Sequence, residues 1–142
     1  IILAEGYATG ASLHMATEKP VAVAFDAGNL EPVAKKLRER FPNAAIIICA
    51  DNDHKHTRRT SDGMEPWNKG VELAQKAAQE VGGKVVAPLF TDEERARGLT
   101  DFNDLHQSRG LDEVKRQVGF VLQKGVAQDK GQERGKAREL SL

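Results

Sequence analysis

Four short runs of mainly apolar residues constrain the fold of this 142-residue chain more than any other feature. They occupy residues 1–4, 21–25, 45–50 and 84–87, and segments with helical periodicity separate them. A strand that is apolar at nearly every position is buried on both faces, which is typical of parallel strands covered by helices. The pattern therefore predicts an α/β fold with a parallel four-stranded sheet flanked by helices.

The segments between and after these runs predict helices at residues 7–17, 30–40, 69–81, 102–108 and 111–123. Asn29 directly precedes the second of these helices, and we expect it to cap the first turn. Residues 54–67 are predicted to form a polar loop, and a loop of that length in a compact domain favours a functional role. Residues 123–142 are polar and contain several glycines, so we predict a flexible C-terminal tail or linker there.

Carboxylates follow two of the predicted strands at the point where each strand ends. Glu5 comes directly after the first strand, and Asp51 and Asp53 come directly after the third. Ligands of parallel sheets bind outside the carboxyl ends of the strands, so these side chains converge if the two strands are neighbours. Three clustered carboxylates cannot all stay ionised without a cation, and oxygen-only ligands suit Mg²⁺ or Mn²⁺. Such sites handle phosphates, which points to phosphoryl transfer on nucleotides or nucleic acid.

Each of these acids also has an interpretation without chemistry. Glu5 alone is equally consistent with a first-turn acid beside a helix dipole. Asp51 and Asp53 are also typical of a solvated turn, although the three isoleucines shortly before them favour a metal site. Asp101 and Asp104 lie at a predicted helix start, where Asp101 is expected to be an N-cap, with or without a metal or water contact.

His54 and His56 form a His-x-His pair beside the acids. That spacing occurs in zinc sites, but the only further histidines are the distant His14 and His106. We therefore prefer a phosphate or nucleotide contact, or plain solvation, for this pair.

Basic side chains near the acids are the candidate contacts for nucleotide or DNA phosphates: Lys55, Arg58, Arg59 and Lys69. A solvated basic loop is the rival interpretation. Trp67 is the only tryptophan, and packing of the loop onto the core is favoured over base stacking.

Formal net charge is zero, with 21 basic and 21 acidic side chains, so nucleic acid must bind through a local patch. The single cysteine, Cys49, lies in an apolar run, which excludes a disulfide framework and indicates a reducing, cytoplasmic setting. No apolar run is long enough to predict a membrane partner. The chain begins at Ile1 inside a predicted strand, so we expect a domain of a larger protein.

Three motifs in a fixed order resemble a Toprim domain, the catalytic fold of bacterial-type primases, topoisomerases and some nucleases. They are Glu5-Gly6, Asp51-Asn52-Asp53 and Asp101-Phe102-Asn103-Asp104. The resemblance is greatest to the Toprim domains of plasmid and conjugative-transfer DNA primases, and it spans roughly residues 1–122. Asn68-Lys69-Gly70 before an alanine-rich helix fits as well, whereas Thr100 stands where the family usually has lysine.

The resemblance implies a Toprim-like (Rossmann-like) catalytic domain at residues 1–122. Glu5, Asp51 and Asp53 are then the catalytic residues, with Glu5 as general acid or base. The implied ligands of Mg²⁺ or Mn²⁺ are Glu5, Asp51, Asp53, Asp101 and Asp104. The only tyrosine, Tyr7, is expected to be structural, because a topoisomerase nucleophile would lie in a separate domain.

The implied activity is primer synthesis, in which a 3′-hydroxyl attacks the α-phosphate of an incoming nucleoside triphosphate on a single-stranded DNA template. Other domains of the same polypeptide are expected partners, and the isolated domain is expected to be inactive without them. Two alternatives stay open: metal-dependent DNA strand cleavage, and a non-catalytic nucleic-acid interaction module. The segment from Asp101 to Asp104 favours the primase, and the intact acids disfavour the module.

Overall fold

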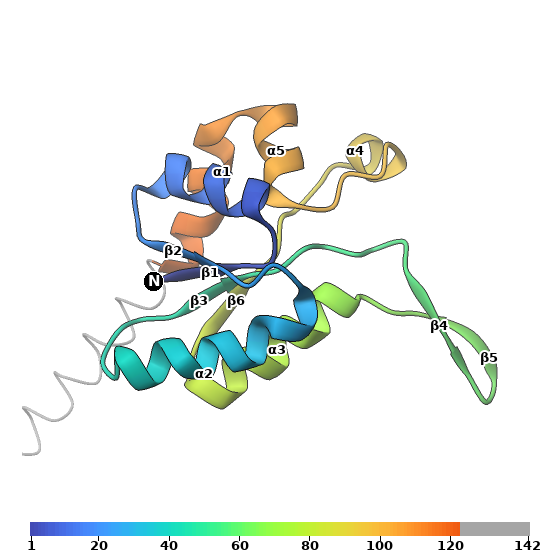
Figure 1. Ribbon diagram of the computed structural model, residues 1–142. Coiled ribbons are helices and arrows are strands. Elements are labelled where there is room, and N and C mark those ends of the chain that lie inside the picture. Colours follow the sequence, from blue (N-terminus) through green and yellow to red (C-terminus); the bar gives the residue numbers. More distant parts are fainter. Residues whose placement is uncertain (123–142) are drawn as a thin grey trace, which may run out of the picture.

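A computed structural model describes residues 1–122 of the chain (Figure 1). Its centre is a parallel four-stranded sheet in the order β2-β1-β3-β6, formed by Val21–Val23, Ile2–Ala4, Ile47–Cys49 and Lys84–Val86. In the register of the sheet, Ile2 lies between Val21 and Ile47. The predicted α/β fold is confirmed, and strands β1 and β3 are direct neighbours. The predicted tail at 123–142 lies outside the described residues.

Helices cover both faces of this sheet (Figure 1). Helices α1 (Tyr7–Thr17) and α5 (Phe102–Arg109) lie on one face, together with a helix at residues 111–122. Helices α2 (Leu30–Arg40) and α3 (Lys69–Val81) lie on the other face.

The two faces explain why the strands are apolar throughout. Ile2 and Ala4 pack into the cluster under α1 and α5, whereas Leu3 between them packs against α2 and α3. Ile47 and Ile48 divide in the same way. Successive side chains of a strand point to opposite faces, so every position of a doubly covered strand is a core position.

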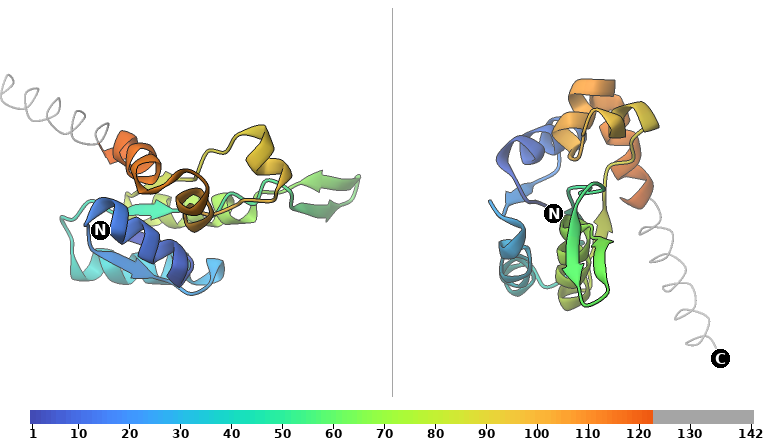
Figure 2. Two further views of the ribbon diagram at one scale, coloured as in Figure 1. Left: turned by 90° about the horizontal axis from the view of Figure 1, so that it is seen from above. Right: turned by 90° about the vertical axis from the view of Figure 1, so that its right-hand side faces the viewer.

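Residues 54–67 correct the prediction of a loop. They contain an antiparallel hairpin of β4 (Thr57–Thr60) and β5 (Gly63–Pro66), closed by the two residues Ser61 and Asp62. Gly63 has φ 124°, a conformation that glycine adopts without the steric cost of a side chain. The hairpin extends away from the sheet and its helices (Figures 1 and 2).

Two further local predictions need correction. Asn29 ends a 3₁₀ turn, η1 (Ala27–Asn29), and its side chain does not cap α2. The side-chain amide of Asn29 donates instead to the Ala24 carbonyl at 3.1 Å. A short helix, α4 (Asp92–Ala96), was not predicted, although Thr91 and Glu94 form a capping box at its start.

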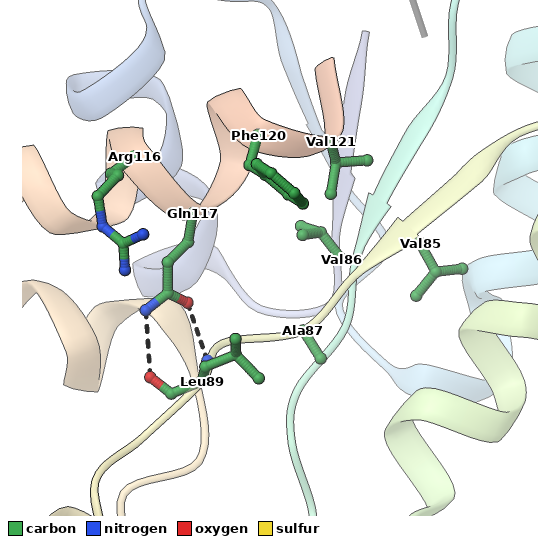
Figure 3. Close-up of a pocket in the computed structure, with 8 residues that line it drawn as sticks. All are labelled: Val85, Val86, Ala87, Leu89, Arg116, Gln117, Phe120 and Val121. Atoms are coloured by element: carbon green, nitrogen blue, oxygen red, sulfur yellow. Dashed lines mark hydrogen bonds between the residues drawn. The ribbon is translucent and has the colours of Figure 1, made fainter. Parts of the chain in front are cut away.

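The segment that leaves β6 toward α4 and α5 is fixed by Gln117. This buried side chain accepts from the Leu89 amide at 2.8 Å and donates to the Leu89 carbonyl at 3.1 Å (Figure 3). The same residues border a mainly apolar pocket of about 340 Å³ between the edge strand β6 and the helix at 111–122. Within the described residues, no helix has the length and apolarity required to cross a membrane.

Candidate metal and nucleotide site

The chain connections diverge at β1 and β3, and the carboxyl edge of these two strands is called the crevice below. Helix α1, which follows β1, covers one face, whereas α3, which follows β3, covers the other (Figure 1). Adjacent strands whose helices diverge in this way form a topological switch point, where open α/β sheets bind their ligands. Glu5 and Asp51 leave the carboxyl ends of these two strands, so the fold brings both to the crevice.

Glu5 and Asp51 are electrostatically coupled. Each carboxyl group acts on the ionisation of the other. Burial, together with the charges of Glu5, Asp101 and Asp53, raises the pKa of Asp51 to about 8. Burial also raises the pKa of Glu5, and Asp53 and Asp26 add to the shift, whereas Lys69 opposes it. Without a cation, the pair therefore holds a proton at neutral pH.

One oxygen of this pair has no partner. Asp51 Oδ1 is buried and makes no hydrogen bond to the described part of the protein. A buried carboxylate oxygen in that state is costly unless a cation, a water or a ligand group meets it. This is the strongest structural indication that something outside the chain completes the crevice.

Asp53 is held differently from Asp51. Its Oδ2 accepts from the Gly70 amide at 2.8 Å, at the start of α3, where the helix dipole favours a negative charge. A Cβ at Gly70 would lie only 2.7 Å from the Asp51 carbonyl oxygen, so glycine is what permits this approach. Glu5 and Asp51 are thus brought together, whereas one carboxylate oxygen of Asp53 is occupied by the backbone.

Two asparagines that the sequence analysis did not assign to the site hold the acidic loop. Asn68 Oδ1 accepts from the Asp53 amide at 2.9 Å and also caps α3 through the Val71 amide. Asn68 Nδ2 donates to Asn52 Oδ1 at 2.8 Å. Asn52 in turn donates from its side chain to the Pro88 carbonyl. The signal for Asn68 was its position as a polar capping residue before a helix.

The backbone of Asn52 also reaches the third acidic motif. Its amide donates to the Thr100 carbonyl at 2.6 Å, which joins the loop after β3 to the start of α5. Asp101 and Asp104 form a capping box there, in which Asp101 accepts from the Asp104 amide at 2.7 Å. Asp104 Oδ2 accepts from the Thr100 and Asp101 amides. The expected N-cap role of Asp101 is therefore observed.

Asp101 also belongs to the electrostatics of the crevice. Burial raises its pKa, with a further contribution from the charge of Asp104. Its own charge raises the pKa of Asp51. Asp101 therefore adds negative potential at the crevice whether or not it touches a metal ion.

The two histidines after Asp53, His54 and His56, do not form a zinc site with other side chains of residues 1–122. His54 Nε2 lies 2.9 Å from the Leu99 carbonyl, to which it must donate, and His56 is exposed. The two distant histidines, His106 and His14, bond through Nδ1 to Ser12 and to the Lys19 carbonyl. Across residues 1–122, no three histidine, cysteine or acidic side chains are arranged as a ready-made metal site.

The candidate phosphate contacts lie in different environments. Arg58 is ion-paired with Glu65 and Glu72 and lies 5.7 Å from the centre of the Trp67 ring. Trp67 donates to Glu72 at 2.6 Å, which ties it to the start of α3, but it belongs to neither hydrophobic cluster of the described residues.

The other three basic side chains, Lys55, Lys69 and Arg59, differ in their contacts and exposure. Lys55 donates to the Ala96 carbonyl at 3.3 Å, and Lys69 acts electrostatically on Glu5. Arg59 is exposed on the opposite face of the hairpin from Arg58, because neighbouring residues of a strand alternate.

The donor set fits a hard divalent cation. Mg²⁺ is usually held by one or two carboxylates, with waters and substrate phosphates completing its coordination. Glu5 and Asp51 supply two such carboxylates, and the unpartnered Asp51 Oδ1 supplies a free oxygen. The absence of a third grouped ligand among the described residues is compatible with that mode of binding.

Comparison with known proteins agrees with this geometry. The chain matches the Toprim domain family over residues 1–112. It is 43% identical over 94 residues to one protein named DNA primase TraC from Escherichia coli, covering 66% of this chain and 6% of that protein. A second protein of the same name and organism is 38% identical over 96 residues, covering 68% of this chain and 9% of the relative.

The chain therefore belongs to the Toprim family. The predicted resemblance to the Toprim domains of plasmid primases is confirmed. The chain spans less than a tenth of the length of either relative. No solved structure matches it.

Proposed function

We propose that this chain is the nucleotidyl-transfer domain of a DNA primase, with a divalent metal ion, Mg²⁺ or Mn²⁺, at the crevice between β1 and β3. The observation that carries the proposal is the buried, unpartnered Asp51 Oδ1 beside Glu5 at the switch point. Membership of the Toprim family and similarity to two proteins named DNA primase support it.

In this proposal Glu5 and Asp51 hold the cation, which neutralises phosphate charge and polarises the phosphoryl oxygen. Glu5 accepts the proton of the primer 3′-hydroxyl as the new oxygen–phosphorus bond forms at the α-phosphate. The bond from that phosphorus to the pyrophosphate group breaks, and pyrophosphate leaves. Lys69, whose charge acts on Glu5, is placed to neutralise the incoming triphosphate.

The remaining acids serve this arrangement. Asp53 anchors the loop after β3 to the start of α3, and its second oxygen remains available to a metal-bound water. Asp101 and Asp104 fix the start of α5 and add negative potential that favours a cation. We therefore assign them indirect contact through water rather than direct ligation.

The nucleic-acid partner in this proposal is single-stranded DNA, and the substrates are nucleoside triphosphates. We assign template phosphate contacts to Arg59 and Lys55, which are exposed on the segment that follows the acidic loop. Flanking domains of the same polypeptide are the proposed source of the remaining template contacts. We also propose a cytoplasmic location, because primer synthesis is a step of DNA replication.

Two measurements test the proposal. Template-directed primer synthesis by the full-length protein should require Mg²⁺ or Mn²⁺, whereas nicking of supercoiled DNA without synthesis would indicate strand cleavage instead. Mn²⁺ titrated into the chain should broaden the NMR signals of Gly6, Asn52 and Asp53 first. Broadening centred on His54 and His56, with selectivity for zinc, would contradict the metal assignment. The absence of both synthesis and cleavage would leave the interaction module.

A further inference from the structure

Phe25 combines two unfavourable features at the carboxyl edge of the sheet. It follows β2 with φ 69°, in the left-handed region that residues with a bulky side chain rarely adopt. Its ring is 77% exposed to solvent. Glycine or asparagine would adopt this backbone conformation more readily.

The fold gains nothing from the Phe25 ring that would offset these features. Phe25 belongs to neither hydrophobic cluster of the described residues. The aromatic–cation contacts recorded for residues 1–122 involve Phe41 and Trp67 instead. Strained backbone that the packing does not require is characteristic of binding and catalytic sites.

Phe25 also lies at the same carboxyl edge of the sheet as the catalytic candidate Glu5. Strands β1 and β2 are paired up to the bond from the Ala24 amide to the Ala4 carbonyl, 2.8 Å long. In this register Glu5 is level with Ala24, the residue directly before Phe25. Asp26 is close enough for its charge to raise the pKa of Glu5. Tyr7, two residues beyond Glu5, carries a second exposed ring, 73% accessible to solvent.

We propose that Phe25, together with the exposed Tyr7 that begins α1, forms a stacking site for the bases of a single-stranded nucleic acid. The inference rests on the proposed function. The carboxyl edge of the sheet carries several acids, so it repels the phosphates of a strand that approaches without metal. Aromatic faces bind every base without using charge, so they can hold a strand at an edge where acids outnumber the basic Lys69.

The test compares two labelled oligonucleotides of equal length, oligo(dT) and an abasic strand, by fluorescence anisotropy with the 142-residue chain. Phe25→Asn removes the ring and tolerates the left-handed backbone, so the fold should persist. Phe25→Leu keeps an apolar side chain without a ring, and Phe25→Trp keeps a ring. Phe41→Asn is the matched control, because Phe41 is a partly exposed ring after the last residue of α2.

We expect Phe25→Asn and Phe25→Leu to weaken oligo(dT) binding about tenfold, equivalent to about 1.4 kcal/mol, and to leave abasic binding unchanged. Phe25→Trp and Phe41→Asn should match the parent chain. Unchanged oligo(dT) binding by both ring-free variants, or an equal loss on both strands, would overturn the stacking site alone. A parent chain that binds neither strand would overturn the stacking site and the proposed DNA contact together. If Phe25→Asn lowers thermal stability, Phe25→Leu decides the outcome.

Discussion

Two groups of buried or half-buried carboxylates in this protein have pKa values shifted in opposite directions. Glu94, only 3% exposed, accepts from the Thr91 amide at 2.9 Å, from Ser108 at 2.7 Å and from Arg109 at 3.1 Å. Burial opposes its ionisation, but these bonds and the Arg109 charge outweigh burial and lower its pKa to about 2. At the crevice, burial and like charge raise the pKa of Asp51 to about 8.

The difference lies in the partners and not in the carboxyl group itself. The chain places Arg109 against Glu94 and Glu113, and Arg116 against Glu113, so this cluster is neutralised from within. At the crevice between β1 and β3, Lys69 is the cation that opposes the raised pKa of Glu5, and it does not outweigh burial and the neighbouring acids. This contrast within one fold supports the proposed cation site at Glu5 and Asp51.

The largest expected effect is on primer synthesis, when the unneutralised pair of Glu5 and Asp51 is changed. Glu5→Gln in the full-length protein should reduce primer synthesis at least about 100-fold, because it removes a charge and a proton acceptor while keeping the side-chain volume. Glu113→Gln, in the neutralised cluster, is the matched control and should keep parental activity. Near-parental synthesis by Glu5→Gln would show that this carboxylate is not catalytic.

The next effect is on stability at the neutralised cluster. Arg109→Met should destabilise the chain by about 2–3 kcal/mol, because it leaves the Glu94 carboxylate buried without its cation. Urea denaturation measures this loss. Adding Glu94→Gln to the same chain should restore part of it, since the uncompensated charge is then gone. If Arg109→Met alone costs less than about 0.5 kcal/mol, the cluster is not what stabilises Glu94.

A smaller, opposite effect is expected from Asp51→Asn. The pKa of Asp51 is 3.8 ordinarily and about 8 in the fold, so between these values the folded chain holds a proton that the unfolded chain has released. Raising the pH through that window therefore lowers the stability of the parent chain.

Asp51→Asn removes this pH dependence. In the presence of a chelator, it should be more stable than the parent chain by about 1–2 kcal/mol at pH 8, with a smaller gap at pH 5. Solvent screens the partly accessible Asp51 carboxyl group, so the stability difference is smaller than the full pKa shift would give. Thermal unfolding at the two pH values measures the gap. A gap that is constant with pH would mean that Asp51 does not hold the proton.

The sequence was sufficient to predict elements whose burial requires a definite pattern of apolar residues. Doubly covered strands such as Ile47–Cys49 must be apolar at every position, so the sheet and its main helices could be predicted. The hairpin could not, because β4 and β5 bury little and are held by cross-strand pairs such as Arg58 with Glu65. The short α4 has only its capping box as a signal.

For the candidate site, the sequence predicted only which acids follow the ends of strands. Residue order placed Glu5 and Asp51 at the carboxyl edge, but their convergence needed the neighbouring order of β1 and β3. The backbone contact that turns Asp53 toward Gly70 depends on the tertiary approach of α3. The left-handed Phe25 had no signal at all, because its conformation contradicts its residue type.

The smallest expected effect separates the two arginines of the hairpin. Arg58 is neutralised by Glu65 and Glu72, as Glu94 is by Arg109, whereas Arg59 is exposed on the other face. Arg59→Ala should weaken single-stranded DNA binding about three- to fivefold at low salt, equally for all sequences, and reduce the salt slope by about one. Arg58→Ala should leave the salt slope unchanged, because its charge is already paired within the protein. Anisotropy across a salt series distinguishes them. Equal slopes for both variants would mean that the hairpin contacts no phosphate through Arg59.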